Sequence, residues 1–204
     1  MDSRSNKILI FTTAFRPFVG GSEIAIEEIM QRLPEFFFEI ITPRFKKLLP
    51  PKERGNNFII HRVGVGLSID KFLFPIMGFF YAKNILRDNK KAIVHSYQAS
   101  YSAGAAWLFK IFNPSSVFIL TMQEGKNLTK QGFLINFLRK LIIWKVDLAT
   151  AISQHLCDYL LSLREKMSVT LIPNGVDLEN FSRQFSYGEL MALEDNLNIK
   201  PDDL

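Results

Sequence analysis

Short apolar runs alternate with longer segments of helical periodicity along most of the chain, and this alternation constrains the fold more than any other feature. Most of the runs are continuously apolar and rich in Ile, Val and Phe, which is typical of strands buried on both faces of a sheet. They lie at residues 8–12, 39–42, 58–63, 92–95, 117–121, 148–152 and 170–172. Helices are expected between them at 22–33, 71–87, 100–112, 133–145 and 153–163. The alternation therefore predicts an α/β fold: a Rossmann-like, doubly wound and mainly parallel sheet with helices on both faces.

The runs near residues 40 and 60 depart from this pattern because no helical periodicity separates them. The connecting segment, 43–57, instead carries five basic residues: Arg44, Lys46, Lys47, Lys52 and Arg54. A charge cluster of this kind is more often a solvated loop than a binding patch, and we expect a loop here. Further along, we expect a helix at 187–197, followed by a turn.

Composition limits the classes of protein to which the chain can belong. Hydrophobic residues make up 48% of the 204 residues, which supplies a sizeable core and argues against disorder. The formal net charge of +5 favours phosphates, nucleotides or anionic lipid as ligands, and no nucleic-acid partner is expected. A single cysteine, Cys157, excludes an internal disulfide. Without a signal-peptide pattern or an apolar run of about 18 residues, we expect a cytoplasmic protein, soluble or peripheral on the inner face of the membrane.

The segment between the first expected strand and helix holds two consecutive glycines, Gly20 and Gly21, followed by Ser22 and Glu23. Glycines let the backbone approach a ligand, and the start of a helix presents unpaired N–H groups with a partial positive charge. In open α/β sheets, ligands bind beyond the carboxyl ends of the strands, which is where this segment falls. Ser22 is expected to cap the helix and Glu23 to complement its dipole. The alternative is a plain turn with a cap, and the spacing matches neither the dinucleotide-binding nor the P-loop pattern.

A second motif, residues 172–177 (Ile-Pro-Asn-Gly-Val-Asp), predicts a strand that ends in a turn with a residue at positive φ. Together with Ala-Ile-Ser at 151–153, which opens a helix, this motif resembles the family 4 glycosyltransferases of the two-domain GT-B fold. The Gly-Gly-Ser-Glu run at 20–23 is similar to the family's glycine-glycine loop. Val-His-Ser at 94–96 and Leu-Thr-Met-Gln-Glu-Gly at 120–125 resemble the ends of its fourth and fifth strands. The likeness extends over about residues 7–203.

The resemblance implies a reaction and a set of contacts. In a retaining enzyme of this kind, a sugar moves from a nucleotide-diphosphate sugar to an acceptor hydroxyl on a glycan, glycolipid or cell-envelope precursor. The donor phosphates would meet Gly20, Gly21 and Ser22. The acceptor would face Glu23, His95, Tyr97, Gln123 and Glu124, while Asn174 and Gly175 would form the interdomain turn. No catalytic residue is assigned, and the resemblance implies no cofactor and no metal beside the donor.

Two departures from the family pattern affect these expectations. Many members carry a histidine after the fifth strand, where this chain has Met122, Gln123 and Glu124. The donor-binding half, which supplies an Arg and a Lys to the diphosphate, is not found. We therefore expect an N-terminal domain at 1–181 and a hinge at 182–204, where the chain stops before a donor-binding domain on the full-length or a companion chain. Such a chain would be inactive alone; the alternative is a non-catalytic sugar-, lipid- or partner-binding module left by gene splitting or truncation.

The three histidines, His61, His95 and His155, lack metal-ligand spacing, so a metal site is not expected. His95, expected at the carboxyl end of a strand, is the best functional candidate among them. The alternative for His95 is a hydrogen-bonded, partly buried side chain. Cys157 is expected in the core or a groove, and His155 at the surface.

The chain has 19 phenylalanines, and two segments, 72–80 and 133–146, would be apolar on nearly every side as helices. The second also carries Arg139, Lys140 and Lys145. An amphipathic helix with a basic face would bind anionic lipid in the plane of a membrane. A buried helix that covers the sheet is the commoner case, and we expect it for both segments.

Overall fold

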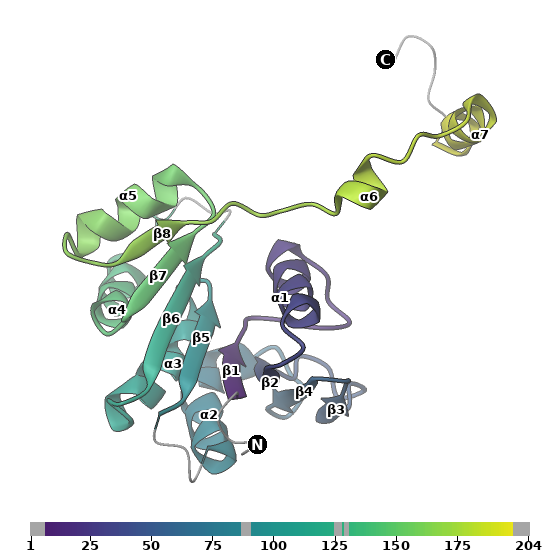
Figure 1. Cartoon of the computed structure of the whole chain (residues 1–204). Coiled ribbons are helices and arrows are strands. Elements are labelled where there is room, and N and C mark those ends of the chain that lie inside the picture. The colour runs from purple at the N-terminus through teal and green to yellow at the C-terminus, as the bar shows by residue number, and fades with distance from the viewer. Residues whose placement is uncertain (1–6, 87–90, 125–127, 129–130, 198–204) are drawn as a thin grey trace. The chain divides into compact units, whose positions relative to one another are not determined.

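A computed structural model describes residues 7–86, 91–124, 128 and 131–197 of the chain (Figure 1). The chain divides into a larger compact unit that ends at Pro173 and a smaller one that begins at Asn174. The larger unit contains the whole sheet and five helices, and the smaller contains two helices, within the part of the chain that is described.

The larger unit is built on one sheet of eight strands in the order β3-β4-β2-β1-β5-β6-β7-β8. The strands are β1 (Lys7–Phe11), β2 (Phe37–Pro43), β3 (Lys52–Arg54), β4 (Phe58–Val63), β5 (Ile93–Tyr97), β6 (Val117–Met122), β7 (Leu148–Ala151) and β8 (Val169–Leu171). Every pairing is parallel except that of β3 with β4. The predicted α/β class and mainly parallel sheet are therefore confirmed.

The edge strand β3 corrects the expectation of a plain loop at 43–57. It runs antiparallel to β4, with Lys52 opposite His61 and Arg54 opposite Ile59. This short excursion separates β2 from β4, which pair parallel without a helix between them. Polar residues form a strand here because β4 offers a free edge, which periodicity along the chain does not reveal.

Helices cover both faces of the sheet (Figure 1). They are α1 (Gly21–Arg32), α2 (Asp70–Ile85), α3 (Tyr101–Phe112), α4 (Phe133–Trp144) and α5 (Gln154–Leu163). Neighbouring residues of β1 point to opposite faces: Leu9 and Phe11 join a core cluster with α2, α3, α4 and α5. Ile10 instead joins a smaller cluster with Ile26 and Met30 of α1.

The segment that opens α2 depends on two glycines with positive φ, Gly64 (127°) and Gly66 (84°). The buried carboxylate of Asp70 accepts hydrogen bonds from the backbone N–H groups of Val65 (3.1 Å), Gly66 (2.7 Å) and Leu67 (3.2 Å). The turn therefore shapes the backbone around the Asp70 carboxylate and fixes the start of α2.

The smaller unit contains α6 (Leu178–Phe181) and α7 (Tyr187–Leu197), and α7 buries none of its residues. The expectation of a positive φ in the Pro-Asn-Gly turn is wrong. Among the described residues, positive φ values occur at Gln98, Gly64 and Gly66, and not at Asn174 or Gly175. The turn pattern describes a preference, and the backbone at these two residues does not follow it.

Candidate functional site

The loops that follow β1, β5 and β6 meet at the carboxyl edge of the sheet, because these three strands are neighbours and run parallel. The hydroxyl of Tyr101, at the start of α3, donates to the backbone carbonyl of Thr13 over 3.1 Å. The Thr13 hydroxyl donates in turn to Oε1 of Gln98, over 3.4 Å. These bonds join the loop after β1 to the loop after β5.

The start of α1 differs from the predicted cap. Gly20 is the N-cap residue, in an extended conformation, and the helix begins at Gly21. Ser22 is therefore not the cap but a buried residue of the first turn. The carboxylate of Glu23 folds back against the cap: a Cβ added to Gly20 would lie 2.6 Å from Glu23 Oε2. A glycine suits the cap position because the first-turn carboxylate occupies the space where a side chain would begin.

Gly21 is exposed and lies beside the side chain of Gln123, just beyond β6. A Cβ added to Gly21 would lie 3.5 Å from Gln123 Nε2, which is an ordinary van der Waals distance. The structure thus brings together the glycine loop and the Gln-Glu segment that the sequence analysis singled out separately. The helix start remains open to solvent at this point.

Glu124 holds the loops after β5 and β6 together. Its carboxylate accepts one hydrogen bond from the backbone N–H of Ala99 and another, over 3.0 Å, from the N–H of Gln123. Burial raises the pKa of the Glu124 carboxyl, although the hydrogen bond from Ala99 and the charge of Arg139 act in the opposite direction. Glu124 is thereby positioned at the edge, with its carboxylate directed to the backbone.

His95 and Tyr97 lie deeper than the sequence predicted. His95 is the third residue of β5, not its carboxyl end, because the strand continues to Tyr97. Its Nε2 lies 2.7 Å from Thr121 Oγ1, which lies 2.7 Å from Thr150 Oγ1, in a polar row across three strands. Burial lowers the pKa of His95 to about 4, so the imidazole is neutral at pH 7. The Tyr97 ring packs on His95 at 4.5 Å between centroids and belongs to the core cluster of α1.

The remaining predicted residues are not part of the loops after β1, β5 and β6. Asn174 and Gly175 belong to the smaller unit. His61 is buried and contacts Glu39 Oε2 over 2.6 Å, Cys157 is buried as expected, and His155 is exposed as expected. The described residues contain no group of three His, Cys, Asp or Glu side chains that could hold a metal ion.

Sequence reasoning missed three polar residues at the edge: Thr13, Gln98 and Tyr101. Gln98 directly follows β5 and has a φ of 65°, a left-handed value that is uncommon outside glycine. Burial, together with the negative charge of Glu23, raises the pKa of Tyr101 to about 12. Each of these residues follows a strand or opens a helix. Because ligands of open α/β sheets bind beyond the carboxyl ends of the strands, this position in the sequence could have indicated them.

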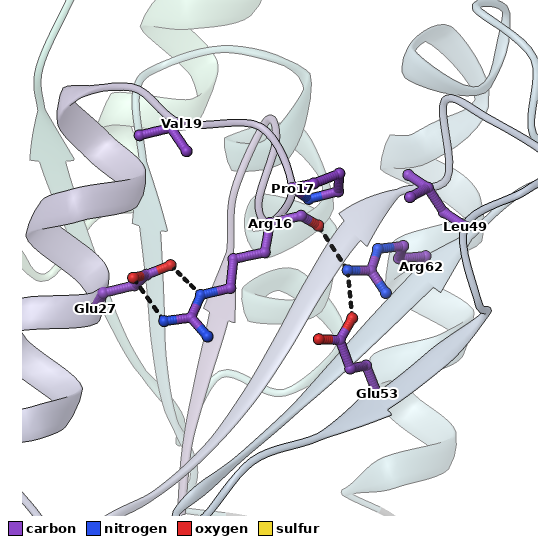
Figure 2. Close-up of a pocket in the computed structure, with 7 residues that line it drawn as sticks. All are labelled: Arg16, Pro17, Val19, Glu27, Leu49, Glu53 and Arg62. Atoms are coloured by element: carbon purple, nitrogen blue, oxygen red, sulfur yellow. Dashed lines mark hydrogen bonds and ion pairs between the residues drawn. The ribbon is translucent and has the colours of Figure 1, made fainter.

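A pocket of about 510 Å³ lies on the outer side of the glycine loop (Figure 2). It is lined by Arg16, Pro17, Val19, Glu27, Leu49, Glu53 and Arg62. The Arg16 guanidinium is paired with Glu27 at 2.5 and 2.8 Å. The Arg62 guanidinium, on β4, donates to the Arg16 carbonyl over 2.6 Å and to Glu53 over 2.8 Å. The pocket wall therefore combines the hydrogen-bond donors of two guanidinium groups with the acceptors of two carboxylates, and their charges balance.

The mainly parallel sheet and the helices that cover both of its faces define the class of protein: this is a Rossmann-like domain of the GT-B fold. The chain belongs to Glycosyltransferase Family 4, which its sequence matches over residues 19–180. The matched region includes Gly20 and Gly21 as well as Gln123 and Glu124. No curated protein gives a significant match.

Solved structures resemble the fold at low sequence identity. Sucrose-phosphate synthase from Thermosynechococcus elongatus superposes with a TM-score of 0.71 at 14% identity, over 96% of this chain and 53% of that chain. A structure described as trehalose-6-phosphate from E. coli bound with UDP-2-fluoro glucose superposes with a TM-score of 0.61 at 10% identity, over 95% of this chain and 55% of that chain. UDP-N-acetylglucosamine 2-epimerase from Rickettsia bellii superposes with a TM-score of 0.57 at 13% identity, over 96% of this chain and 52% of that chain. The chain thus spans about half the length of each of these proteins.

Proposed function

We propose that the chain is the acceptor-side domain of a retaining glycosyltransferase that moves a sugar from a nucleotide-diphosphate sugar to an acceptor hydroxyl. Membership of the family supports the reaction class. The observation that carries the assignment to this edge is the approach of Gly21 to Gln123, which joins the helix start to the end of β6. The proposal includes a cytoplasmic location for this reaction.

The start of α1 faces the donor diphosphate in this proposal. Sugar transfer builds negative charge on the leaving diphosphate, so fixed hydrogen-bond donors there stabilise the transition state. The exposed backbone at Gly21 offers N–H groups at the positive end of a helix, without a Cβ to keep the phosphate away. Gly20 and Ser22 hold this backbone in place, one as the cap and the other buried in the first turn.

The acceptor sugar meets the polar side chains at the same edge. Gln123 offers an amide group of the kind that binds sugar hydroxyls, and the carboxylates of Glu23 and Glu124 hold the start of α1 and the loops around this amide in place. His95 and Tyr97 support the edge from within β5, and the neutral imidazole is bonded to Thr121. The pocket in Figure 2, with paired guanidinium and carboxylate groups, extends the polar surface from the glycine loop toward β4 and suits a further sugar unit of the acceptor.

The donor is bound mainly by a second domain that these 204 residues do not contain. The chain covers 53% of sucrose-phosphate synthase, which supports a second domain of similar size. One structure with this fold is bound with UDP-2-fluoro glucose, which supports a nucleotide-sugar donor. That second domain is carried on the full-length or a companion chain.

Calorimetric titration of UDP-glucose and GDP-mannose into the 204-residue chain tests the proposal. Two missing charged contacts, each worth about 1.5–3 kcal/mol, should weaken donor binding by roughly 10² to 10⁴ relative to the complete enzyme. Addition of the donor-binding domain should restore binding and allow transfer, with the anomeric configuration of the product followed by NMR. Micromolar donor binding or turnover by the isolated chain would overturn the assignment. Sugar binding without transfer in the complete assembly would instead indicate a binding module.

A further inference from the structure

One side of α4 remains at the surface although the helix is strongly apolar. Ile142 and Ile143 pack into the larger core cluster, and Arg139 is buried beside them. On the other side, Phe133 is 86% exposed, Leu134 65% and Trp144 62%, while Phe137 is half exposed. The expectation of a helix buried on the sheet is therefore correct for one side of α4 and wrong for the other.

The helix α2 shows the same division. Phe74, Phe79 and Ala82 are buried in the larger cluster, whereas Phe72, Ile76 and Phe80 are 58–71% exposed. These three exposed residues are four apart, so they lie along one side of the helix. Both α2 and α4 cover the same face of the sheet, with α3 between them (Figure 1). We call the exposed residues Phe72, Ile76, Phe80, Phe133, Phe137 and Trp144 the outer apolar surface.

The exposed charges on the two helices that carry the outer apolar surface are of one sign. All residues of α2, α3 and α4 are described, and Asp70 is the single acidic residue among them; it is fully buried. Lys83 and Lys140 are exposed on α2 and α4, and the exposed Lys145 directly follows α4. Asp147, the next acidic residue, is paired with Lys110 at 2.7 Å. The surface therefore combines apolar side chains with exposed positive charge.

We propose that the outer apolar surface docks on an anionic membrane, with its aromatic and aliphatic side chains at the lipid interface and its lysines among the headgroups. The helices have 16 and 12 residues, shorter than the roughly 20 that cross a bilayer, so they would lie in the plane of the membrane. None of the described helices is both long and apolar enough to span a membrane. A second copy of the chain fits less well, because pairing two such surfaces would bring lysines against lysines.

Co-sedimentation with vesicles tests this inference independently of sugar transfer. The 204-residue chain should bind vesicles that contain phosphatidylglycerol and lose binding in 0.5 M NaCl, and it should not bind phosphatidylcholine alone. Phe137→Ser with Trp144→Ser should weaken binding at least tenfold. The matched control is Ile24→Ser, which removes a side chain that is 51% exposed on α1, across the sheet, and should leave binding unchanged.

The charge contribution needs a second pair of variants. Lys140→Gln with Lys145→Gln should weaken vesicle binding about thirtyfold, which corresponds to about 1 kcal/mol for each lysine. Lys47→Gln, in the exposed basic loop before β3, is the control and should change little. Circular dichroism checks that each variant is folded. Absence of binding to phosphatidylglycerol, equal binding to neutral vesicles, equal loss in the controls, or a solution dimer that Phe137→Ser dissociates would each overturn the proposal.

Discussion

The carboxylate of Glu124 accepts a hydrogen bond from the backbone N–H of Ala99, so a single side chain joins the loops after two neighbouring strands. The second carboxylate oxygen accepts from the N–H of Gln123, over 3.0 Å. Because Gln123 also lies beside Gly21, this arrangement couples the end of β6 to the start of α1. The candidate site is thus held by contacts between loops rather than within them.

Replacement of Glu124 should destabilise the domain. Glu124→Ala leaves the N–H groups of Ala99 and Gln123 without this acceptor, which should lower the free energy of unfolding by about 1–3 kcal/mol. Glu124→Gln keeps one oxygen acceptor and should recover part of the loss. Urea unfolding measures both, with the exposed Glu165→Ala as control. Equal stability of Glu124→Ala and the unchanged chain would show that these bonds do not hold the loops.

The glycine at the start of α1 should matter for transfer more than for folding. A Cβ at Gly21 has room, at 3.5 Å from Gln123 Nε2, but the larger side chain of Gly21→Val would stand in the path of a diphosphate. In a complete, active assembly we expect a loss of at least tenfold in transfer rate with little change in the melting temperature. Gly132→Val, at the N-cap of α4, where nothing lies within 4 Å of the added Cβ, is the control. Unchanged activity of Gly21→Val would reduce the loop to a plain turn.

The partly buried and desolvated imidazole of His95 predicts a pH dependence of stability. Its folded-state pKa is about 4 against an ordinary value of 6.5, so between these values the unfolded chain binds the proton and the folded chain does not. Stability should therefore fall as the pH decreases from 6.5 toward 4, by at most about 1.4 kcal/mol per pH unit. His95→Gln should remove this contribution, whereas His155→Gln, at the surface, should keep it. Urea unfolding of the unchanged chain and both variants between pH 4 and pH 6.5 measures how the free energy of unfolding changes with pH; a slope that persists in His95→Gln would show that another group causes it.

The buried pair of Glu39 and His61 predicts that stability in acid also depends on the ionisation of the Glu39 carboxyl. Burial acts to raise the pKa of Glu39, but the hydrogen bond and charge of His61, together with Lys7, bring it below the ordinary value. The stabilisation is therefore present above the unfolded pKa near 4.5 and lost as the pH falls through the folded value. Glu39→Gln should cost about 1–3 kcal/mol at pH 7, and the difference should shrink below pH 4. Glu28→Gln, in an exposed pair with Arg32, should cost less than about 0.5 kcal/mol at either pH.

The turn before α2 should not tolerate a side chain at Gly66. Its φ is 84°, and an added Cβ would lie 2.6 Å from the backbone nitrogen of Lys47. Gly66→Ala should therefore destabilise the fold by about 1–3 kcal/mol in thermal unfolding. The control is Gly188→Ala on α7, where an added Cβ meets nothing within 4 Å. If Gly66→Ala left the melting temperature unchanged, the backbone segments at Gly66 and Lys47 could move apart without a loss of stability.

The sequence by itself determined the type and place of most elements. The strand predicted at 58–63 is β4, and the helix predicted at 187–197 is α7, with the same bounds. Apolar runs and helical periodicity are local properties, set by side chains a few residues apart, so they can be read along the chain. The local signals also placed Gly20, Gly21, Gln123 and Glu124 after strands, and hence at one edge of a parallel sheet.

Only the tertiary structure decided which of these residues meet and which are buried. Gly21 lies beside Gln123 because β1, β5 and β6 are neighbours, and strand order is a property of the whole sheet. The strand β3 forms because the edge of β4 was free. The exposure of Phe133 and Phe137 depends on what packs over α4, which no periodicity within the helix can show. Local side-chain patterns choose a helix or a strand, whereas contacts between distant residues depend on how the elements pack together.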